Sequence, residues 1–172
     1  MQQVSFQKLA EQHCQNISNF CECATKIEEA ELKKYPGLNR VGAKINIQLD
    51  NGRMITLADV ENPNSPRRYR FERRENNFYI FQVCCWEWSE RELVNASTGK
   101  RFTTFGEQLF SPSGKYMVSF QDEDFSRNGI DVFEIDGALI RKIFSDVLTM
   151  SAIRWKDTDH LEVLDPGFLN GK

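Results

Sequence analysis

Histidine is scarce in this chain, which has two histidines among its 172 residues. The sequence also lacks a Gly-x-Ser-x-Gly elbow, a glycine-rich phosphate loop and a His-Glu-x-x-His helix, the local motifs of several common enzyme classes. Carboxylates are abundant on predicted loops, but abundance alone does not indicate the shifted pKa values that catalysis needs. The sequence therefore predicts a protein that is not an enzyme and has no cofactor.

Long apolar runs are missing as well. No stretch approaches the ~20 apolar residues that a helix needs to span a bilayer, and residues 1–13 lack the basic and apolar regions of a secretory signal. We expect a cytoplasmic protein without membrane contact, or a periplasmic one if an export signal has been removed. The length fits a single domain over residues 1–172, and 40% hydrophobic residues are enough for a core.

The five cysteines are an odd number and are unevenly placed. Cys84 and Cys85 are adjacent in an apolar run, and adjacent residues of a strand point to opposite faces, so this pair should not form a bridge. Near the N-terminus, Cys14 can pair with Cys21 or with Cys23 if the compartment is oxidising. In the cytosol all five thiols would stay reduced.

Three further patterns each have a plainer interpretation. His13 and the N-terminal cysteines could be a zinc set, but they lack the paired spacing of structural zinc sites. The run 124–129 begins like a calcium loop, but Ile135 stands where a bidentate glutamate is expected, which favours a polar hairpin loop. Five arginines within 67–74 alternate with apolar residues, as on the solvated face of a strand. We therefore expect no metal site and no nucleic-acid partner.

Apolar residues at three- and four-residue steps predict a helical arm over 5–34, with Glu28, Glu29 and Glu31 on its exposed side. After Gly42 the period changes to two, which predicts antiparallel β structure over 43–165. Asn51-Gly52 lies between the first two alternating runs and would supply the two positive φ angles of a type I′ turn. We expect strands near 44–49, 53–57, 68–73, 78–86, 91–95, 101–105, 116–121, 130–135, 139–144, 152–155 and 160–164.

Two acidic runs contain the candidate binding residues. The run 121–125 places three acids beside one aromatic residue between two predicted strands, and the run 86–92 mixes two tryptophans with three acids. Aromatic anchors ringed by acids suit a cationic protein surface. For the tryptophans we favour a place in the core, whereas the acidic loop is compatible with partner binding and with a merely solvated turn. The candidate partner-binding residues are Asp122, Glu123, Asp124 and Phe125, with Glu87 and Glu90 as weaker candidates.

The segments FSPSGKYMVSF, GIDVFEIDGALIRKIF and IRWKDTDHLEVL resemble consecutive strands of β-propeller blades. A closed propeller needs at least four blades of ~40 residues, and the chain after the first predicted loop is too short for that. The fold class that we expect is therefore mainly β with a helical N-terminal arm, with open antiparallel sheets that resemble a partial β-propeller.

The strings ELKKYPGL, IQLDNGRMITL, ELVNASTGK and FSPSGKYMV resemble a family of small bacterial proteins that have a cysteine-containing helical arm and a partial propeller. In size and in its net charge of −3, the chain also resembles immunity proteins of contact-dependent growth inhibition systems. Such proteins bind a toxin domain, often a basic nuclease, and block its active site. This resemblance implies one-to-one binding of a cognate toxin; the alternative is an exported envelope protein with a structural or ligand-binding role.

Overall fold

A computed structural model of the chain describes Cys14 and residues 20–62, 66–84, 89–121, 129–147 and 152–164. These residues form one helix followed by strands that all pair in antiparallel fashion. The elements are α2 (Phe20–Leu32), β1 (Leu38–Val41), β2 (Lys44–Gln48), β3 (Met54–Ala58), β4 (Arg68–Glu75), β5 (Phe78–Cys84), β6 (Ser89–Asn95), β7 (Arg101–Phe105), β8 (Glu107–Phe110), β9 (Tyr116–Gln121), β10 (Gly129–Asp136), β11 (Leu139–Asp146), β12 (Ala152–Trp155) and β13 (Leu161–Leu164).

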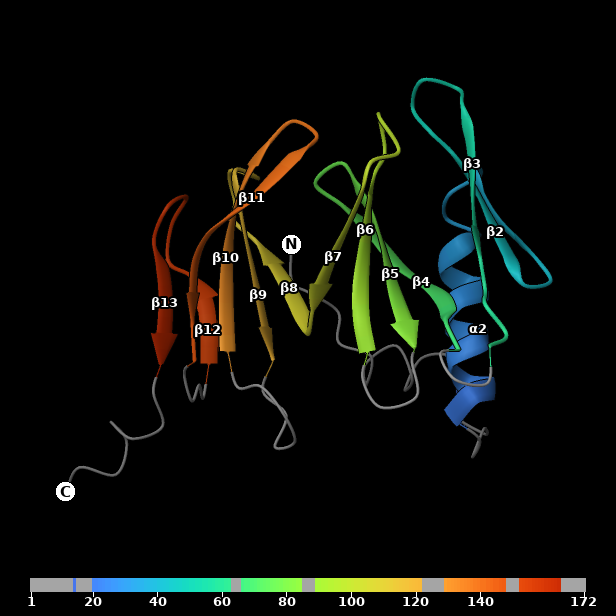
Figure 1. Ribbon diagram of the computed structural model, residues 1–172, viewed down its shortest axis with the longest axis horizontal. Coiled ribbons are helices and arrows are strands. Elements are labelled where there is room, and N and C mark those ends of the chain that lie inside the picture. Colours follow the sequence, from blue (N-terminus) through green and yellow to red (C-terminus); the bar gives the residue numbers. More distant parts are fainter. Residues whose placement is uncertain are drawn as a thin grey trace.

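The strands form four open sheets that follow one another along the chain. Sheet 1 contains β1–β3, sheet 2 contains β4–β7, sheet 3 contains β8–β11, and sheet 4 is the hairpin of β12 and β13. Figure 1 shows the sheets side by side, from sheet 1 and α2 on the right to sheet 4 on the left. The prediction of a mainly β fold with open antiparallel sheets is confirmed. Among the described residues, no helix combines the length and the apolar character that crossing a bilayer requires.

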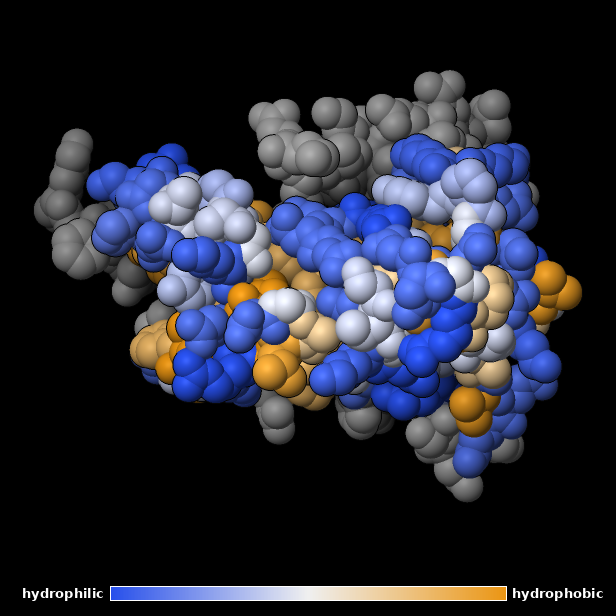
Figure 2. All heavy atoms as spheres, turned by 90° about the horizontal axis from the view of Figure 1, so that it is seen from above, coloured by the Kyte–Doolittle hydropathy of each residue, from blue (hydrophilic) through white to orange (hydrophobic). Residues whose placement is uncertain are grey.

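Three hydrophobic clusters lie in series between these layers. The first packs α2 and sheet 1 against sheet 2, around Phe71 and Phe81. The second lies between sheets 2 and 3, around Phe78 and Met117, and the third joins sheets 3 and 4 around Val118. Outside these clusters the described surface in Figure 2 is mainly hydrophilic, with smaller hydrophobic areas between.

Strand β5 shows why this sequence forms stacked sheets. Because side chains alternate across a strand, Tyr79 and Phe81 point into the first cluster, while Phe78 and Ile80 point into the second. A strand that is covered on both faces has apolar residues at consecutive positions, which explains the run 78–81. Sheet 2 is therefore an inner layer of the fold.

The turns correct one prediction. Asn51-Gly52 does lie between β2 and β3, but only Gly52 has a positive φ, of 81°. The amide of Gly52 donates to Leu49 O at 2.9 Å, which makes a three-residue loop with glycine at its end and not a type I′ turn. The two consecutive positive φ angles occur instead at Asn76 and Asn77, in the two-residue connection of β4 and β5. Asparagine tolerates this conformation better than most residues.

The predicted strands need two corrections. The β structure begins at Leu38 and not at residue 43, because β1 pairs with β2. Strand β8 was not among the expected strands, and it pairs with β9 at the edge of sheet 3. Helix α2 covers the second half of the predicted arm, and residues 5–19 lie outside the described residues apart from Cys14. Glu28 and Glu31 are buried, contrary to the exposed side expected for them.

One buried and one partly buried carboxylate bind the outer edge of β4, the first strand of sheet 2. Glu28 of α2 accepts a hydrogen bond from the backbone N–H of Phe71 at 2.8 Å, and Asp59 accepts one from the N–H of Tyr69 at 2.8 Å. Arg40 of β1 pairs with Glu28 at 2.9 and 3.0 Å and with Asp59 at 3.3 Å. These side chains satisfy the donors that an edge strand would otherwise present to other chains.

Two local features fix the connections of the later sheets. Gly106 joins β7 of sheet 2 to β8 of sheet 3 with a φ of 67°, and a Cβ there would lie 2.1 Å from the carbonyl oxygen of Phe120.

Asp157, in the turn of sheet 4, accepts hydrogen bonds from the N–H groups of Asp159 and His160, both at 2.9 Å. The bond from Asp159 is the main reason why the pKa of Asp157 is lowered to about 2, with a further contribution from the His160 side chain.

Candidate functional site

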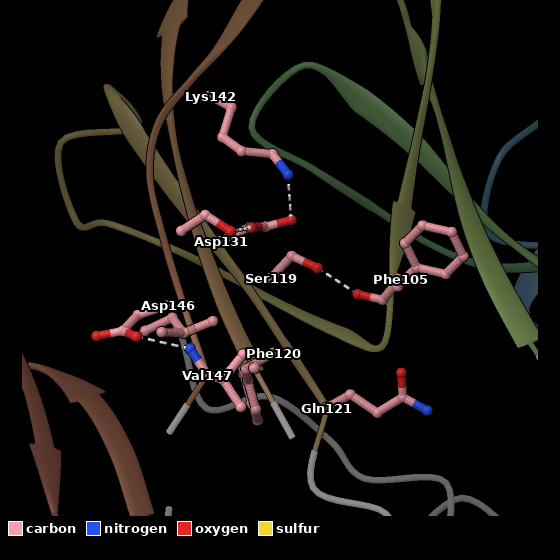
Figure 3. A pocket seen from close by; sticks show the side chains of 11 residues that line it. Phe105, Ser119, Phe120, Gln121, Asp131, Lys142, Asp146 and Val147 are labelled. Atoms are coloured by element: carbon pink, nitrogen blue, oxygen red, sulfur yellow. Dashed lines mark hydrogen bonds and ion pairs between the residues drawn. The ribbon is translucent and has the colours of Figure 1, made fainter. Parts of the chain in front are cut away.

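A pocket of about 360 Å³ opens where β7 of sheet 2 meets the strands of sheet 3. Its walls come from the end of β7, the end of β9, the start of β10 and the second half of β11. Figure 3 shows these side chains around the cavity. The lining residues are Phe105, Ser119, Phe120, Gln121, Gly129, Ile130, Asp131, Lys142, Ser145, Asp146 and Val147.

The polar wall of the pocket is a row of side chains across three neighbouring strands. Asp131 of β10 lies opposite Ser119 of β9 and opposite Ser145 of β11, so all three share one face of sheet 3. Ser145 donates its hydroxyl to the Asp131 carboxylate at 2.6 Å, and Lys142 Nζ lies 2.8 Å from the same carboxylate. In Figure 3 Lys142 and Asp131 point toward each other, and Ser119 points to the backbone of Phe105, whose oxygen accepts its hydroxyl.

The rim of the pocket adds apolar surface and a second carboxylate. Phe105 is 47% exposed and Val147 is 81% exposed, although both are large hydrophobic residues. On the β11 side of the pocket, the Asp146 carboxylate accepts a hydrogen bond from the N–H of Val147 at 2.8 Å. Exposed rings and aliphatic groups beside carboxylates can hold an amphipathic cationic group, such as the side chain of a lysine or an arginine.

Most of the predicted binding residues lie outside the described part of the chain. This holds for Asp122, Glu123, Asp124 and Phe125, and also for Glu87 and the two tryptophans beside it. The run 122–128 nevertheless connects Gln121 to Gly129 in the sequence, and both of these residues line the pocket. Glu90 is described: it accepts a hydrogen bond from Arg67 at 2.8 Å, and its side chain is 15% exposed.

Two arginines of the run, Arg73 and Arg74, contact other residues of the same chain. Arg74 lies 2.9 Å from Asp50 and covers the ring of Tyr79 at 4.9 Å. Arg73 binds Glu75 at 2.9 Å and donates to the carbonyl of Gln108 at 3.1 Å. These contacts fit the interpretation of a strand face and give no support to phosphate binding.

A charged cluster joins sheets 2 and 3 beside the second hydrophobic cluster. Arg91 is buried and lies 2.8 Å from both Glu72 and Glu107. Burial raises the pKa of Glu72, against the opposing effect of the Arg91 and Arg73 cations. Because each charge has a partner on another strand, we interpret this cluster as a structural connection and not as a reactive centre.

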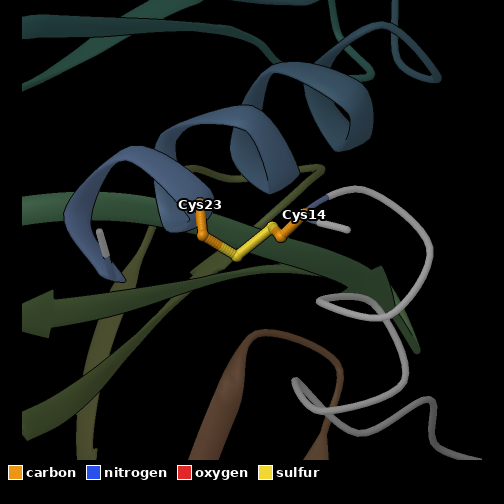
Figure 4. The surroundings of a disulfide bond; sticks show 2 residues. All are labelled: Cys14 and Cys23. Carbon is orange, nitrogen blue, oxygen red and sulfur yellow. A yellow bond between two sulfur atoms is a disulfide. The ribbon is translucent and has the colours of Figure 1, made fainter. Parts of the chain in front are cut away.

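The structure contains one of the disulfide bonds that the sequence allowed. Cys14 and Cys23 form a disulfide, with their Cα atoms 5.4 Å apart, which is one of the two pairings that the sequence left open (Figure 4). The bond fastens the chain before α2 to the first half of that helix. It also uses two of the four residues of the conceivable zinc set. The described residues contain no group of three or more histidine, cysteine or acidic side chains that could hold a metal ion.

Sequence reasoning missed Asp131, Lys142 and Ser145. A weak signal existed for two of them, because Asp131 and Lys142 are polar positions within the apolar runs 130–135 and 139–144, whereas Ser145 lies beyond the second run. Comparisons with protein-family models, with curated proteins and with solved structures gave no match. The functional argument therefore rests on the pocket and on the charges around it.

Proposed function

We propose that this protein binds a cationic partner protein at the pocket between sheets 2 and 3, and that it acts as an immunity protein. The partner would be a toxin domain, in particular a basic nuclease, held one-to-one. One observation carries the proposal: the pocket combines the exposed side chains of Phe105 and Val147 with the carboxylate of Asp131. The strands that flank it are connected in the sequence by the acidic run 122–124.

The proposed mechanism is occlusion. Phe105 and Val147 would fill apolar parts of the partner's surface, and the acids would pair with the lysines and arginines that otherwise bind RNA phosphates. Asp131 already has the Lys142 cation at 2.8 Å, so a partner cation would meet it as part of a network. Such complementarity mainly increases the association rate and weakens with salt.

We also propose that the four sheets form a partial β-propeller. Sheets 2 and 3 are both four-stranded and both place sequence neighbours beside one another, which is the strand order of propeller blades. An incomplete set of blades would leave the outer faces of its first and last blades uncovered. The pocket lies between two of the four-stranded sheets, where β7 passes into sheet 3.

The experiment is a binding measurement with the toxin domain encoded directly upstream. Asp122, Glu123 and Asp124 are replaced together by alanine, and in a second variant Phe105 is replaced by serine. The matched control replaces the exposed acids Glu29, Glu61 and Asp136, which changes the net charge equally at other places. We expect both test variants to weaken binding at least tenfold relative to the control. Truncating a desolvated interface charge costs roughly 2–5 kcal/mol, and truncating a buried aromatic anchor costs about 2 kcal/mol or more. Unchanged binding by both would move the interface elsewhere, and no binding by the unaltered protein would end the immunity proposal.

The Cys14–Cys23 disulfide favours a second candidate, an exported envelope protein with a structural or ligand-binding role. Disulfides persist in oxidising compartments such as the periplasm and are rare in the bacterial cytosol. Thiol labelling of Cys14 in the native host separates the two candidates. Blocked Cys14 supports export, and fully labelled Cys14 supports the cytoplasmic immunity protein.

A further inference from the structure

Strand β11 is an edge strand with an unusual amount of exposed apolar surface. It is the outermost strand of sheet 3, whose order is β11-β10-β9-β8. Nine large hydrophobic residues are exposed in the described part of the chain, and four of them lie on β11 or directly after it. These four are Leu139, Ile143, Phe144 and Val147. An edge of this kind is a template for pairing with another strand.

A β-bulge in β11 determines which side chains share a face. Lys142 pairs with Phe133 and Phe144 pairs with Val132, so Ile143 is the extra residue. The alternation of faces reverses at this point. As a result Arg141 lies on the same face as Phe144 and Asp146, whereas Lys142 lies on the same face as Ser145.

This arrangement makes β11 complementary to a second copy of itself. In an antiparallel pair with Ile143 opposite Phe144 of the second copy, Arg141 lies opposite Asp146 and Lys142 lies opposite Ser145. The same register places Ile140 opposite Val147. Apolar residues thus meet apolar residues, opposite charges meet at two symmetric positions, and every pair outside the bulge shares one face of the sheet.

Other registers lose this match. A shift by one residue would place side chains from opposite faces against each other, because of the reversal at Ile143. A shift by two would place Arg141 opposite Phe144 and Leu139 opposite Asp146. The match is therefore specific to one register about one twofold axis.

We propose that two copies of this chain associate through β11 and join their four-stranded sheets 3 into one continuous antiparallel sheet. The twofold axis passes between Ile143 and Phe144, so the association stops at the dimer. A single pair of strands buries less surface than the 1,200 to 2,000 Å² or so of standard stable interfaces, so the dimer should dissociate in the micromolar range. The inference does not rest on the proposed function, but Asp146 and Val147 line the pocket as well, so the dimer and a partner at the pocket would compete for these two residues.

The test uses charge exchange and sedimentation equilibrium of the full chain. Arg141→Asp alone places two acids opposite each other at both ends of the pair, and Asp146→Arg alone places two cations there. Each should weaken dimerisation by about tenfold or more, because like charges directly opposite are unfavourable at two symmetric positions. The double variant Arg141→Asp/Asp146→Arg restores opposite charges and should recover most of the affinity.

Two controls separate association from folding. Arg154→Asp/Glu162→Arg exchanges an exposed cross-strand pair of sheet 4, at 2.5 Å, and should leave dimerisation unchanged. Arg141 also pairs with Glu134 within the chain at 2.5 Å, and the double variant does not restore that contact. Recovery in the double variant must therefore come from contacts between copies. A protein that stays monomeric up to millimolar concentration, or a double variant that associates no better than the single ones, would overturn the proposal.

Discussion

Replacing Glu28 by alanine tests whether buried carboxylates hold the first layers of the fold together. The Glu28 carboxylate joins three elements, because it binds the Arg40 guanidinium through two nitrogens at 2.9 and 3.0 Å and accepts the N–H of Phe71 at 2.8 Å. The side chains of Glu28 and Arg40 are 6% and 18% exposed. The substitution would leave a nearly buried cation with fewer partners and would remove the acceptor of a buried amide.

The expected loss of unfolding free energy is about 3 kcal/mol. Breaking a buried ion pair from one side costs roughly 3–5 kcal/mol, and an unsatisfied buried amide adds about 1 kcal/mol. The total is reduced because Arg40 keeps Asp59 at 3.3 Å and reaches solvent in part. With an m-value of about 2 kcal/mol per molar, the urea midpoint should fall by about 1.5 M.

Urea titration followed by far-ultraviolet circular dichroism measures this loss. Glu29→Ala is the matched control, since Glu29 is the next residue of α2 and is exposed. Glu28→Gln keeps an oxygen for the Phe71 amide but loses the charge, and it should cost about half as much as alanine. If Glu28→Ala and Glu29→Ala lowered the midpoint equally, the contacts of Glu28 would contribute nothing net and the reasoning would be refuted.

Three further predictions concern the backbone, pH and the disulfide. Gly106→Ala should destabilise the protein by about 3 kcal/mol or more in the same titration, because the new Cβ would collide with a backbone carbonyl. Gly42 has a similar φ but open space around it, so Gly42→Ala should cost only about 1 kcal/mol. Because the pKa of Asp157 is lowered, its carboxylate stabilises the fold at pH values above its ordinary pKa of 3.8, and this contribution is lost as the pH falls toward about 2. The amide chemical shifts of Asp159 should therefore titrate with a midpoint near pH 2. A midpoint near pH 4 would contradict the assigned hydrogen bonds. Reducing the Cys14–Cys23 bond, which closes a loop with a sequence separation of 9, should lower stability by about 2–3 kcal/mol. Protein taken from an oxidising compartment and denatured without reductant should show three thiols, the five cysteines less the bonded two, whereas protein from the cytosol should show five.

Local patterns predicted the strands well where enough residues alternate. The runs that became β5 and β10 have several apolar positions and clear turn residues beside them, so period and turn chemistry were sufficient. β1 and β8 have four residues each, and β1 buries only Leu38. β8 buries Gln108, a polar residue whose side chain donates to Thr104 at 2.9 Å. A pattern of hydrophobicity has too few positions to detect such strands.

The site was less predictable because it depends on contacts between distant strands. Ser119 lies opposite Asp131 through the pairing of β9 and β10, and Ser145 lies opposite Asp131 only because of the bulge at Ile143, and no local signal gives these registers. Glu28 was expected on the exposed side of a helix, since a glutamate seldom lies in a core without a partner. Its partners, Arg40 and Phe71, are 12 and 43 residues away in the sequence.

The serial order of the three hydrophobic clusters has a consequence for cooperativity. Each cluster is shared by neighbouring layers, so stability should be distributed as in repeat proteins, where each unit is held by its neighbours. In the described part of the chain, sheet 4 contributes to the third cluster alone, through residues such as Trp155, whose indole N–H donates to Leu109 O at 3.1 Å. Its amides should exchange with solvent through local opening, while those of β5, which lies between two clusters, should exchange only when the whole molecule unfolds.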